Sequence, residues 1–391
     1  MDMLHSVLNR GCSLWDRKRM TEDEFRRRLA HVREGMKQRG VDLLLVYGDS
    51  YRFGNLAFIS HFLPKNRGAM AVVPLEGEPA LVVQEPSRNN PFSSTLTWIE
   101  EVHSVGKFAQ GVSEAIKSRG LKPKKVGLVA VEEQLNMREW SELKALLNGA
   151  EFEDSSALLA SLRLVKSSSE LALLRETSRI LGQSLSLFKT AARSGQKEFE
   201  VTALLEREAR RQGVEDFRLL LARSSTPGVG LRPAADSVLK KGEAVLVLAA
   251  ASFQRYWVEL GQTFCLGRPT PGITKSHELA HRVFRKLVEG TKPGVSQKAA
   301  AGWLAEIPSH AARESLKNYG LGNGLGLDVA EEPYLGEEGN RVIEPGMVLT
   351  LRACFTGEEC GSFLISRPYV VTGLGLEPLV KQEEELASIE A

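Results

Sequence analysis

Two histidines four residues apart, in the stretch HELAH at 277–281, have a spacing that is found in metal-binding sites. On a helix, His277 and His281 would share one face and could hold a zinc ion, with Glu278 as general base. Such a site also needs a third ligand, but no histidine follows at the metzincin spacing, and Phe284 stands where that motif has a glycine. We therefore favour a pair of surface histidines, with a zinc enzyme as the weaker alternative.

A second stretch, GLGNGLGLDVAEEPYL at 320–335, joins small and acidic residues. Glycines occupy every second position at its start, at Gly320, Gly322, Gly324 and Gly326. Glycine costs chain entropy, so this density indicates that the backbone needs room or unusual dihedral angles. No Lys-Ser/Thr pair follows, which disfavours a phosphate loop. Asp328 and Glu331 could act as acid or base, or could cap and salt-bridge within the turn.

Three arginines of the second half could form an anion clamp. Arg232, Arg352 and Arg367 together could hold a carboxylate or a phosphate. Each could instead neutralise a neighbouring acid. The sequence leaves both alternatives open.

The first 160 residues read as an alternating α/β unit. Thr21 and Glu24 form the pattern of a capping box at the start of a helix. The helical apolar stripe then gives way to a buried strand in RGVDLLLVYG. GAMAVVPLEGEPALVVQ predicts a hairpin that turns at Gly77 and Pro79. Another strand, KKVGLVAVEE, and another helix follow, which favours a domain over residues 1–160.

Residues 161–391 read as a second domain of the α+β class. Ser167 and Glu170 form a second capping-box pattern, which opens a long amphipathic helix. Helices are expected over 168–192, 197–213, 275–291 and 296–317. Strands are expected over 242–252, 256–267, 346–355 and 363–372. Because strands and helices come in separate blocks, the pattern predicts an α+β arrangement.

The totals restrict the partners that we expect. The chain has 391 residues, 42% of them hydrophobic and 26% charged, with a formal net charge of +2. This balance gives no reason to expect a nucleic acid or a membrane surface as partner. The first twenty residues lack the apolar core of a signal peptide, and no apolar run is long enough to span a membrane. The cysteines, Cys12, Cys265, Cys354 and Cys360, indicate free thiols in a reducing compartment, which we expect to be the cytoplasm.

The order of several motifs resembles one enzyme family. VLVLAAASFQRYWVELGQTF is followed by EGTKPG, GNGLGLDVAEEP, VIEPGMVLTLRACF and FLISRPYVVT. This order resembles the catalytic half of the creatinase, aminopeptidase P and prolidase family, which has the pita-bread fold. The first half resembles the creatinase-like α/β domain that precedes it. The resemblance implies a homodimer, and an activity in which two divalent ions hydrolyse a peptide bond next to proline.

The family's metal ligands are two Asp, one His and two Glu, and the resemblance places other residues at these positions. Leu248 stands at the first Asp position and Glu259 at the second. Asn323 stands at the His position, Arg352 at the first Glu position and Ser366 at the second. A permanent cation such as Arg352 would repel a metal. The resemblance therefore implies no metal ligands and no cofactor in this chain.

The family's supporting histidines are replaced as well. Tyr319 and Ala330 align with two of them, and the third falls near Leu231 and Arg232. The five ligand positions carry one negative charge, on Glu259, and one positive charge, on Arg352, so their sum is zero without any metal. We therefore expect a Glu259–Arg352 ion pair at the former metal site.

Three classes of function follow. The first is a non-peptidase that binds a small anionic or peptide ligand through Arg352, Glu259, Asn323, Ser366 and Arg232. The second is a metal-free, creatinase-like hydrolase of a small C–N substrate, with Glu259, Glu331 or Tyr319 as catalytic candidates and Arg352 holding a carboxylate or an oxyanion. The third is a metallopeptidase whose ligands lie elsewhere in the second half, although His277, His281 and His310 are its only histidines.

Overall fold

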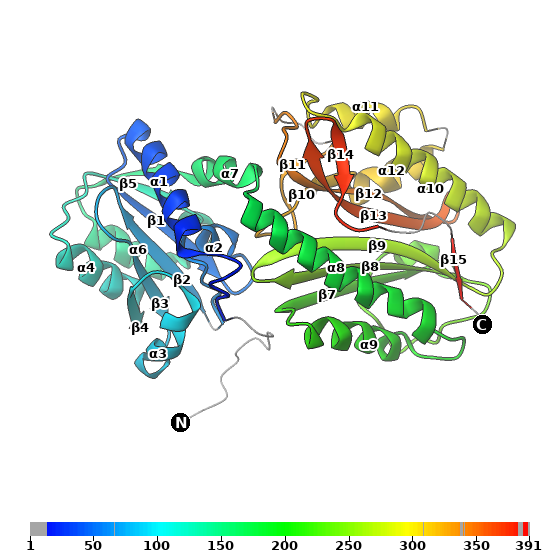
Figure 1. Ribbon diagram of the computed structural model, residues 1–391, viewed down its shortest axis with the longest axis horizontal. Helices are drawn as coiled ribbons and strands as arrows, with labels where there is room; N and C mark the ends of the chain where they lie inside the picture. Colours follow the sequence, from blue (N-terminus) through cyan, green and yellow to red (C-terminus); the bar gives the residue numbers. More distant parts are fainter. Residues whose placement is uncertain are drawn as a thin grey trace. The chain divides into compact units, whose positions relative to one another are not determined.

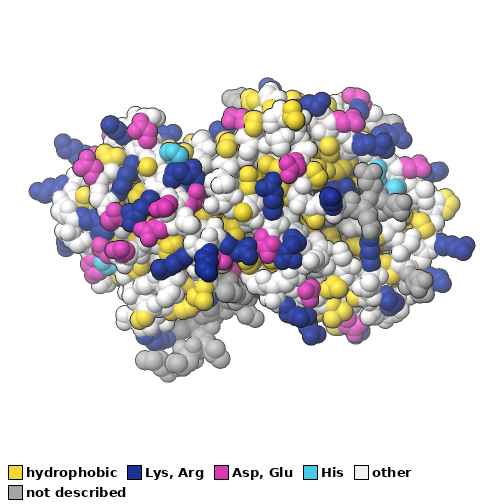
Figure 2. All heavy atoms as spheres, in the orientation of Figure 1, with side chains coloured by type: hydrophobic (Ala, Val, Ile, Leu, Met, Phe, Trp, Pro, Cys, Tyr) yellow, Lys and Arg dark blue, Asp and Glu magenta, His cyan; other side chains and the backbone are white. Residues whose placement is uncertain are grey.

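The computed structural model describes residues 14–65, 67–307, 309–336, 339, 341–381 and 386–389. It divides into two compact units, Met1–Arg163 and Leu164–Ala391, close to the boundary expected after residue 160. Over the described ranges, no helix is long and apolar enough to cross a membrane. On the face drawn in Figure 2, basic and acidic side chains are interspersed, in keeping with the small net charge.

The N-terminal unit is built on a six-stranded sheet in the order β4-β3-β2-β1-β5-β6 (Figure 1). Its strands are β1 (Leu43–Asp49), β2 (Gly68–Pro74), β3 (Ala80–Gln84), β4 (Glu101–Val105), β5 (Lys125–Val129) and β6 (Glu151–Asp154). The strands β2 and β3 pair antiparallel, which confirms the hairpin. The central strands β1 and β2 are buried along almost their whole length because helices cover both faces of the sheet.

The helices of this unit supply the two outer layers. They are α1 (Glu22–Arg39), α2 (Gly54–Ser60), α3 (Asn90–Ser93), α4 (Phe108–Ser118), α5 (Val131–Gln134), α6 (Met137–Leu146) and α7 (Ser156–Leu164). Two 3₁₀ turns, η1 (Ser87–Asn89) and η2 (Ser94–Leu96), flank α3. Phe108, Trp140 and Leu143 from α4 and α6 pack with Leu43, Leu45 and other strand residues in one core.

The C-terminal unit carries a nine-stranded sheet whose main path is β11-β10-β12-β13-β9-β8-β7, with β14 on β13 and β15 on β9. The strands are β7 (Asp216–Arg223), β8 (Ala244–Phe253), β9 (Tyr256–Leu266), β10 (Gly322–Gly324), β11 (Glu331–Tyr334), β12 (Val348–Gly357), β13 (Gly361–Thr372), β14 (Gly375–Pro378) and β15 (Ala387–Ile389). The four strands expected from the sequence correspond to β8, β9, β12 and β13.

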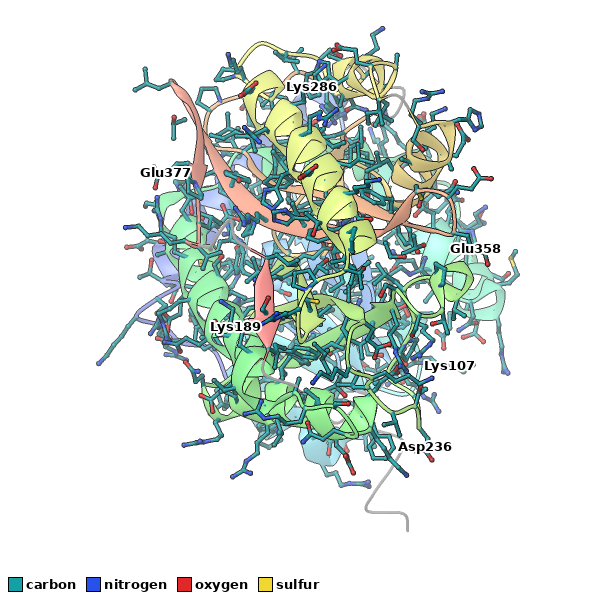
Figure 3. The ribbon with its side chains drawn as sticks, turned by 90° about the vertical axis from the view of Figure 1, so that its right-hand side faces the viewer. Lys107, Lys189, Asp236, Lys286, Glu358 and Glu377 are labelled. Carbon is teal, nitrogen blue, oxygen red and sulfur yellow. The ribbon has the colours of Figure 1, made fainter. Side chains whose placement is uncertain are left out.

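The helices of the C-terminal unit are α8 (Ser168–Ala191), α9 (Glu198–Arg211), α10 (Pro271–Gly290), α11 (Ala299–Leu304) and α12 (His310–Tyr319), with a 3₁₀ turn η3 (Pro227–Val229). Figure 3 shows α10 lying across the curved sheet, with Lys286 towards its C-terminal end. Along β12, Leu349, Leu351, Ala353 and Phe355 pack in the core under α10 and α12. Alternate residues of a strand point to opposite faces, so Thr350, Arg352 and Cys354 face away from that core.

Two expectations about helices were wrong. The Thr21 side chain makes no capping hydrogen bond, and Glu24 instead binds Arg27 and Arg28. The helix expected over 296–317 is two helices, and the Oγ of Ser309 caps the second by accepting from the N–H of Ala312. The second capping box, between Ser167 and Glu170, is confirmed by both of its hydrogen bonds.

Candidate functional site

Strand register brings three of the sequence-predicted positions, Leu248, Ser366 and Arg352, into one row across the sheet. Leu248 on β8 pairs with Gly261 on β9, Gly261 pairs with Ser366 on β13, and Ser366 pairs with Arg352 on β12. Residues that pair directly point to the same face. Glu259, two residues before Gly261, shares that face as well. The row therefore lies on the sheet face opposite the α10 and α12 core.

An ion pair between Arg352 and Glu259 forms the centre of this site. The Nη2 of Arg352 lies 2.7 Å from Oε1 and 2.8 Å from Oε2 of Glu259, and its Nε lies 3.0 Å from Oε1. Only 12% of the Arg352 side chain and 9% of the Glu259 side chain are exposed. The expected ion pair is thus confirmed. Its bidentate, desolvated geometry is the strong form of this interaction.

Polar neighbours complete the coordination of both charged groups. Arg352 also donates from Nη1 to the carbonyl oxygen of Tyr319 at 2.8 Å and from Nη2 to Oδ1 of Asn323 at 3.3 Å. Ser366 Oγ donates to Oε1 of Glu259 at 2.6 Å and lies 3.1 Å from Oγ1 of Thr350. Glu259, Asn323, Arg352 and Ser366 are therefore brought together.

Leu248 lies on the apolar side of this site. It packs against a small cluster made of Ala222, Leu246, Cys354 and Leu364, together with Leu231 and Tyr319. Burial raises the pKa of the Cys354 thiol well above its ordinary value, although the nearby Arg352 acts in the opposite direction. Cys354 is consequently a neutral, buried thiol. The Leu248 end of the row is therefore apolar and has no side chain that would ligate a metal ion.

The glycines of the turn are explained by close backbone approach. A Cβ at Gly322, where φ is 147°, would lie 2.1 Å from the carbonyl oxygen of Thr350. A Cβ at Gly324 would lie 2.2 Å from the carbonyl oxygen of Glu332. The strand β10 therefore fits between β11 and β12 only without side chains at these positions. This packing presents Asn323 to Arg352.

The remaining catalytic candidates are engaged in contacts of their own. Glu331 forms a salt bridge with Lys166, whose side chain is 2% exposed, at 2.5 Å. The hydroxyl of Tyr319 lies 3.0 Å from Oγ1 of Thr356 and accepts from the N–H of Leu231 at 3.3 Å. Glu331 thus forms a salt bridge, although with a lysine outside the turn rather than within it, and Tyr319 tethers the loop after η3.

Arg232 lies in a different ion-pair cluster. Its Nη1 and Nη2 donate to Oε2 and Oε1 of Glu198 at 2.6 and 2.8 Å, and Arg223 lies 3.4 Å from the same carboxylate. The guanidinium of Arg367 lies 5.6 Å from the ring centroid of Phe284, in the helix-covered core. The arginines therefore do not form the three-membered clamp, and Arg232 is placed with Glu198 rather than with Glu259.

The two histidines of HELAH lie on α10, with ring centroids 4.2 Å apart, and His277 packs edge-on against Phe363 at 5.3 Å. Within the part of the chain that the structure describes, no group of three or more His, Cys, Asp or Glu side chains is placed to hold a metal ion. Both histidines are half-buried rather than exposed, and the pair packs against the sheet through Phe363.

Two neighbours of the site were missed by the sequence reasoning, namely Thr350 and Cys354. Both lie two residues from Arg352 on β12, and a strict period of two along this strand would have assigned them to the same face.

The comparisons with known proteins assign both halves of the chain. Residues 172–373 match the model of metallopeptidase family M24, which is more than half of the chain. Residues 28–165 match the Creatinase/Prolidase N-terminal domain.

The chain belongs to metallopeptidase family M24.

Among its relatives, an Xaa-Pro dipeptidase of Pyrococcus horikoshii is 24% identical over 367 residues, which cover 93% of this chain and 99% of that protein. The structure of a prolidase from the same organism superimposes with a TM-score of 0.80 at 23% identity, covering 92% of this chain and 99% of the other. A His361Ala variant of Escherichia coli aminopeptidase P gives a TM-score of 0.73 at 16% identity, covering 93% and 96%. The resemblance seen in the sequence is confirmed at the level of family and fold.

The five residues that the resemblance sets at the family's ligand positions do not together fit a pair of divalent ions. Hard cations require several oxygen ligands, mostly carboxylates. Here a single carboxylate, on Glu259, faces the guanidinium of Arg352 at 2.7 Å, which already satisfies its charge. Leu248 offers no donor, and Asn323 directs its Oδ1 to Arg352.

Proposed function

We propose that this M24 chain is a non-peptidase that has lost the dinuclear metal site of its family. The observation that carries the proposal is the Arg352–Glu259 ion pair, whose atoms occupy the row where the family's ligands are expected. The cation replaces the neutralising charge that metal ions would supply. The site is therefore balanced without metal, rather than left with carboxylates that repel one another.

We further propose that the site binds a small anionic or peptide ligand. A guanidinium has five N–H donors. The contacts within the described chain leave one Nη1–H of Arg352 beyond its bonds to Glu259, Tyr319 and Asn323. Gly320 places no side chain over that nitrogen, whereas a Cβ at this position would be in van der Waals contact with Nη1, at 3.7 Å. A ligand carboxylate is the natural acceptor for this donor.

The names of the relatives indicate which carboxylate to try first. Several are Xaa-Pro dipeptidases, so an Xaa-Pro dipeptide is the first peptide to test as a ligand that is held without being cleaved. Because Glu259 already neutralises Arg352, we expect modest affinity. A cytoplasmic homodimer remains part of this proposal.

The first experiment measures metal content and turnover together. The protein is purified without chelator, its metals are determined by elemental analysis, and Ala-Pro hydrolysis is followed with and without added Mn²⁺. We expect substoichiometric metal and no turnover. Stoichiometric metal with Mn²⁺-dependent turnover would overturn the proposal. Turnover that survives EDTA would instead favour the metal-free hydrolase, with Glu259, Glu331 and Tyr319 as candidates.

The second experiment measures Ala-Pro binding by calorimetry. The double variant Glu259→Gln/Arg352→Met removes the ion pair without leaving one charge buried alone. A hydrogen bond to a charged group contributes about 1.5–3 kcal/mol, so we expect the double variant to bind roughly tenfold more weakly or worse. Arg367→Met, next to Ser366 on the opposite face of β13 and beside Phe284, is the matched control. Equal binding by wild type and double variant would place the ligand elsewhere.

A further inference from the structure

A cavity lies wholly within the N-terminal unit, among residues that the proposed function does not use. Its volume is about 450 Å³. It is lined by residues 62, 64, 65 and 67 between α2 and β2, by the end of β3, and by the η1–α3–η2 stretch, which Figure 1 shows beside β3 and β4. All of these elements belong to one compact unit. Pockets for small ligands generally measure about 300–1,000 Å³, so this one suits a compact organic molecule.

The inner wall of the cavity is apolar. Phe62, Val83 and Leu96 line it, and their side chains are 2%, 4% and 1% exposed. Pro64 adds a further apolar surface. Phe92, by contrast, is 47% exposed although it lines the same cavity, so its ring forms a wall that solvent still reaches. A half-exposed aromatic ring over a hydrocarbon floor favours the burial of a flat or branched apolar group.

The rim of the cavity is positively charged. Lys65, Arg67 and Arg88 line it, against one acid, Glu85. The Nζ of Lys65 lies 4.9 Å from the centroid of the Phe92 ring, so a cation stands directly beside the aromatic wall. Glu85 is engaged by Ser104, which donates to its Oε1 at 2.9 Å. The lining thus carries an excess of two positive charges around an apolar floor.

From this combination we infer that the cavity is a binding site for a small organic carboxylate with an aromatic or branched aliphatic body. The apolar body lies on Phe62, Val83 and Leu96 beside Phe92. The carboxylate lies at the rim formed by Lys65, Arg67 and Arg88. The lining of this site includes neither Arg352 nor Glu259, and the inference does not depend on the function proposed for them.

The chemistry of the lining argues against two other ligand classes. An inorganic anion would leave the apolar floor in contact with water and gain only from exposed cations, which contribute little each. A neutral apolar molecule would use the apolar floor and make no use of the positive charge of the rim. A ligand that joins both properties uses both parts of the wall, as small-molecule sites generally do.

The test uses the full chain and two fluorinated probes, 4-fluorophenylacetate and its neutral analogue 4-fluorophenylacetamide. Binding is followed by ¹⁹F NMR titration. For such a small probe we expect saturable binding of the acid in roughly the millimolar range. The amide should bind roughly two- to fivefold more weakly, as should the acid to Arg88→Gln, because each loses one partly exposed ion pair.

Two further variants make the result specific. Phe92→Ala removes the half-exposed ring and should also weaken the acid, with the unfolding temperature unchanged. Arg138→Gln removes an arginine from α6 in the same unit, outside the cavity lining, and should leave binding unaltered. The inference is overturned if acid and amide bind alike, if Arg138→Gln weakens binding as much as Arg88→Gln, or if the acid binds equally well to wild type, Arg88→Gln and Phe92→Ala.

Discussion

At the scale of single residues, the site is defined by one cation that faces one carboxylate. Arg352 and Glu259 lie 93 positions apart in sequence, and yet both could be assigned in advance because each falls within a motif of known order. Their contact then followed from charge alone. The partner of Arg232 could not be assigned in the same way. Glu198 lies on helix α9, and no sequence motif indicates that this helix packs beside Arg232.

Removing one member of the buried pair should destabilise the protein more than removing both. In Arg352→Met, Glu259 stays buried without its partner, and we expect a loss of about 3–5 kcal/mol in the free energy of unfolding. The double variant Glu259→Gln/Arg352→Met should recover most of it. Urea unfolding of the two variants and of wild type checks this. A single variant that loses less than about 1 kcal/mol would show that the pair is not desolvated as described.

The Glu198 carboxylate should make the protein sensitive to acid. Burial opposes its ionisation, but hydrogen bonds from Arg232 and from the N–H of Ala235 outweigh burial and lower its pKa below the ordinary value. The unfolded chain therefore takes up the proton first as the pH falls. The stabilisation is complete at neutral pH and is lost progressively below about pH 4.3.

Glu198→Gln should accordingly lower the unfolding temperature at pH 7 and flatten its decline towards pH 4. Thermal unfolding at pH 7, 5 and 4 measures this, with Glu208→Gln on the same helix as control. A variant that declines with pH as steeply as wild type would contradict the assignment.

At the scale of elements, β10 is a strand that owes its position to missing side chains. Gly324→Ala would place a Cβ 2.2 Å from the carbonyl oxygen of Glu332, so β10 and β11 would have to separate. We expect a loss of about 1–3 kcal/mol, as for other overpacked sites. Gly302→Ala in α11 meets nothing within 4 Å and should be neutral or stabilising by up to about 1 kcal/mol. Equal effects of the two changes on urea unfolding would contradict this account.

The two capping patterns, alike in sequence, should respond differently to mutation. Ser167 accepts from the N–H of Glu170, so Ser167→Ala should cost about 1 kcal/mol. The side chain of Thr21 makes no capping bond, and Thr21→Ala should stay within about 0.5 kcal/mol of wild type. Urea unfolding of both variants provides the comparison. A larger effect of Thr21→Ala would show that its hydroxyl caps α1 in solution.

The contrast between these helix starts shows why elements are easier to predict than their contacts. Glu24 matches the capping-box pattern, but Arg27 and Arg28 lie one turn further along the same helix and bind its carboxylate instead. The capping-box pattern takes no account of other side chains that can bind the same carboxylate. Likewise, apolar periodicity continued through 296–317, whereas Ser309 starts a new helix within that range.

At the scale of the whole molecule, the chain has the fold of family M24, and we propose that its five ligand positions differ in chemistry. Strand alternation and motif order were enough to predict both units and the four long strands of the second. The row Leu248–Gly261–Ser366–Arg352 could not be seen from the sequence, because it depends on the register of four strands from two separate hairpins. The strand register fixes the backbone positions of this row, whichever side chains the sequence places there.

If the register alone preserves the site, metal binding should be recoverable by side-chain replacement. The variant Leu248→Asp/Glu259→Asp/Asn323→His/Arg352→Glu/Ser366→Glu restores the family's ligand types at all five positions. Without metal, its carboxylates would repel one another and lower the unfolding temperature. With Mn²⁺ at a hundredfold excess over the dissociation constant, binding should return about 2.7 kcal/mol of stability. Thermal unfolding with MnCl₂ and with EDTA measures both effects, and wild type should respond to neither. A folded variant that Mn²⁺ does not stabilise would show that the backbone, and not only the five side chains, has moved away from a metal site.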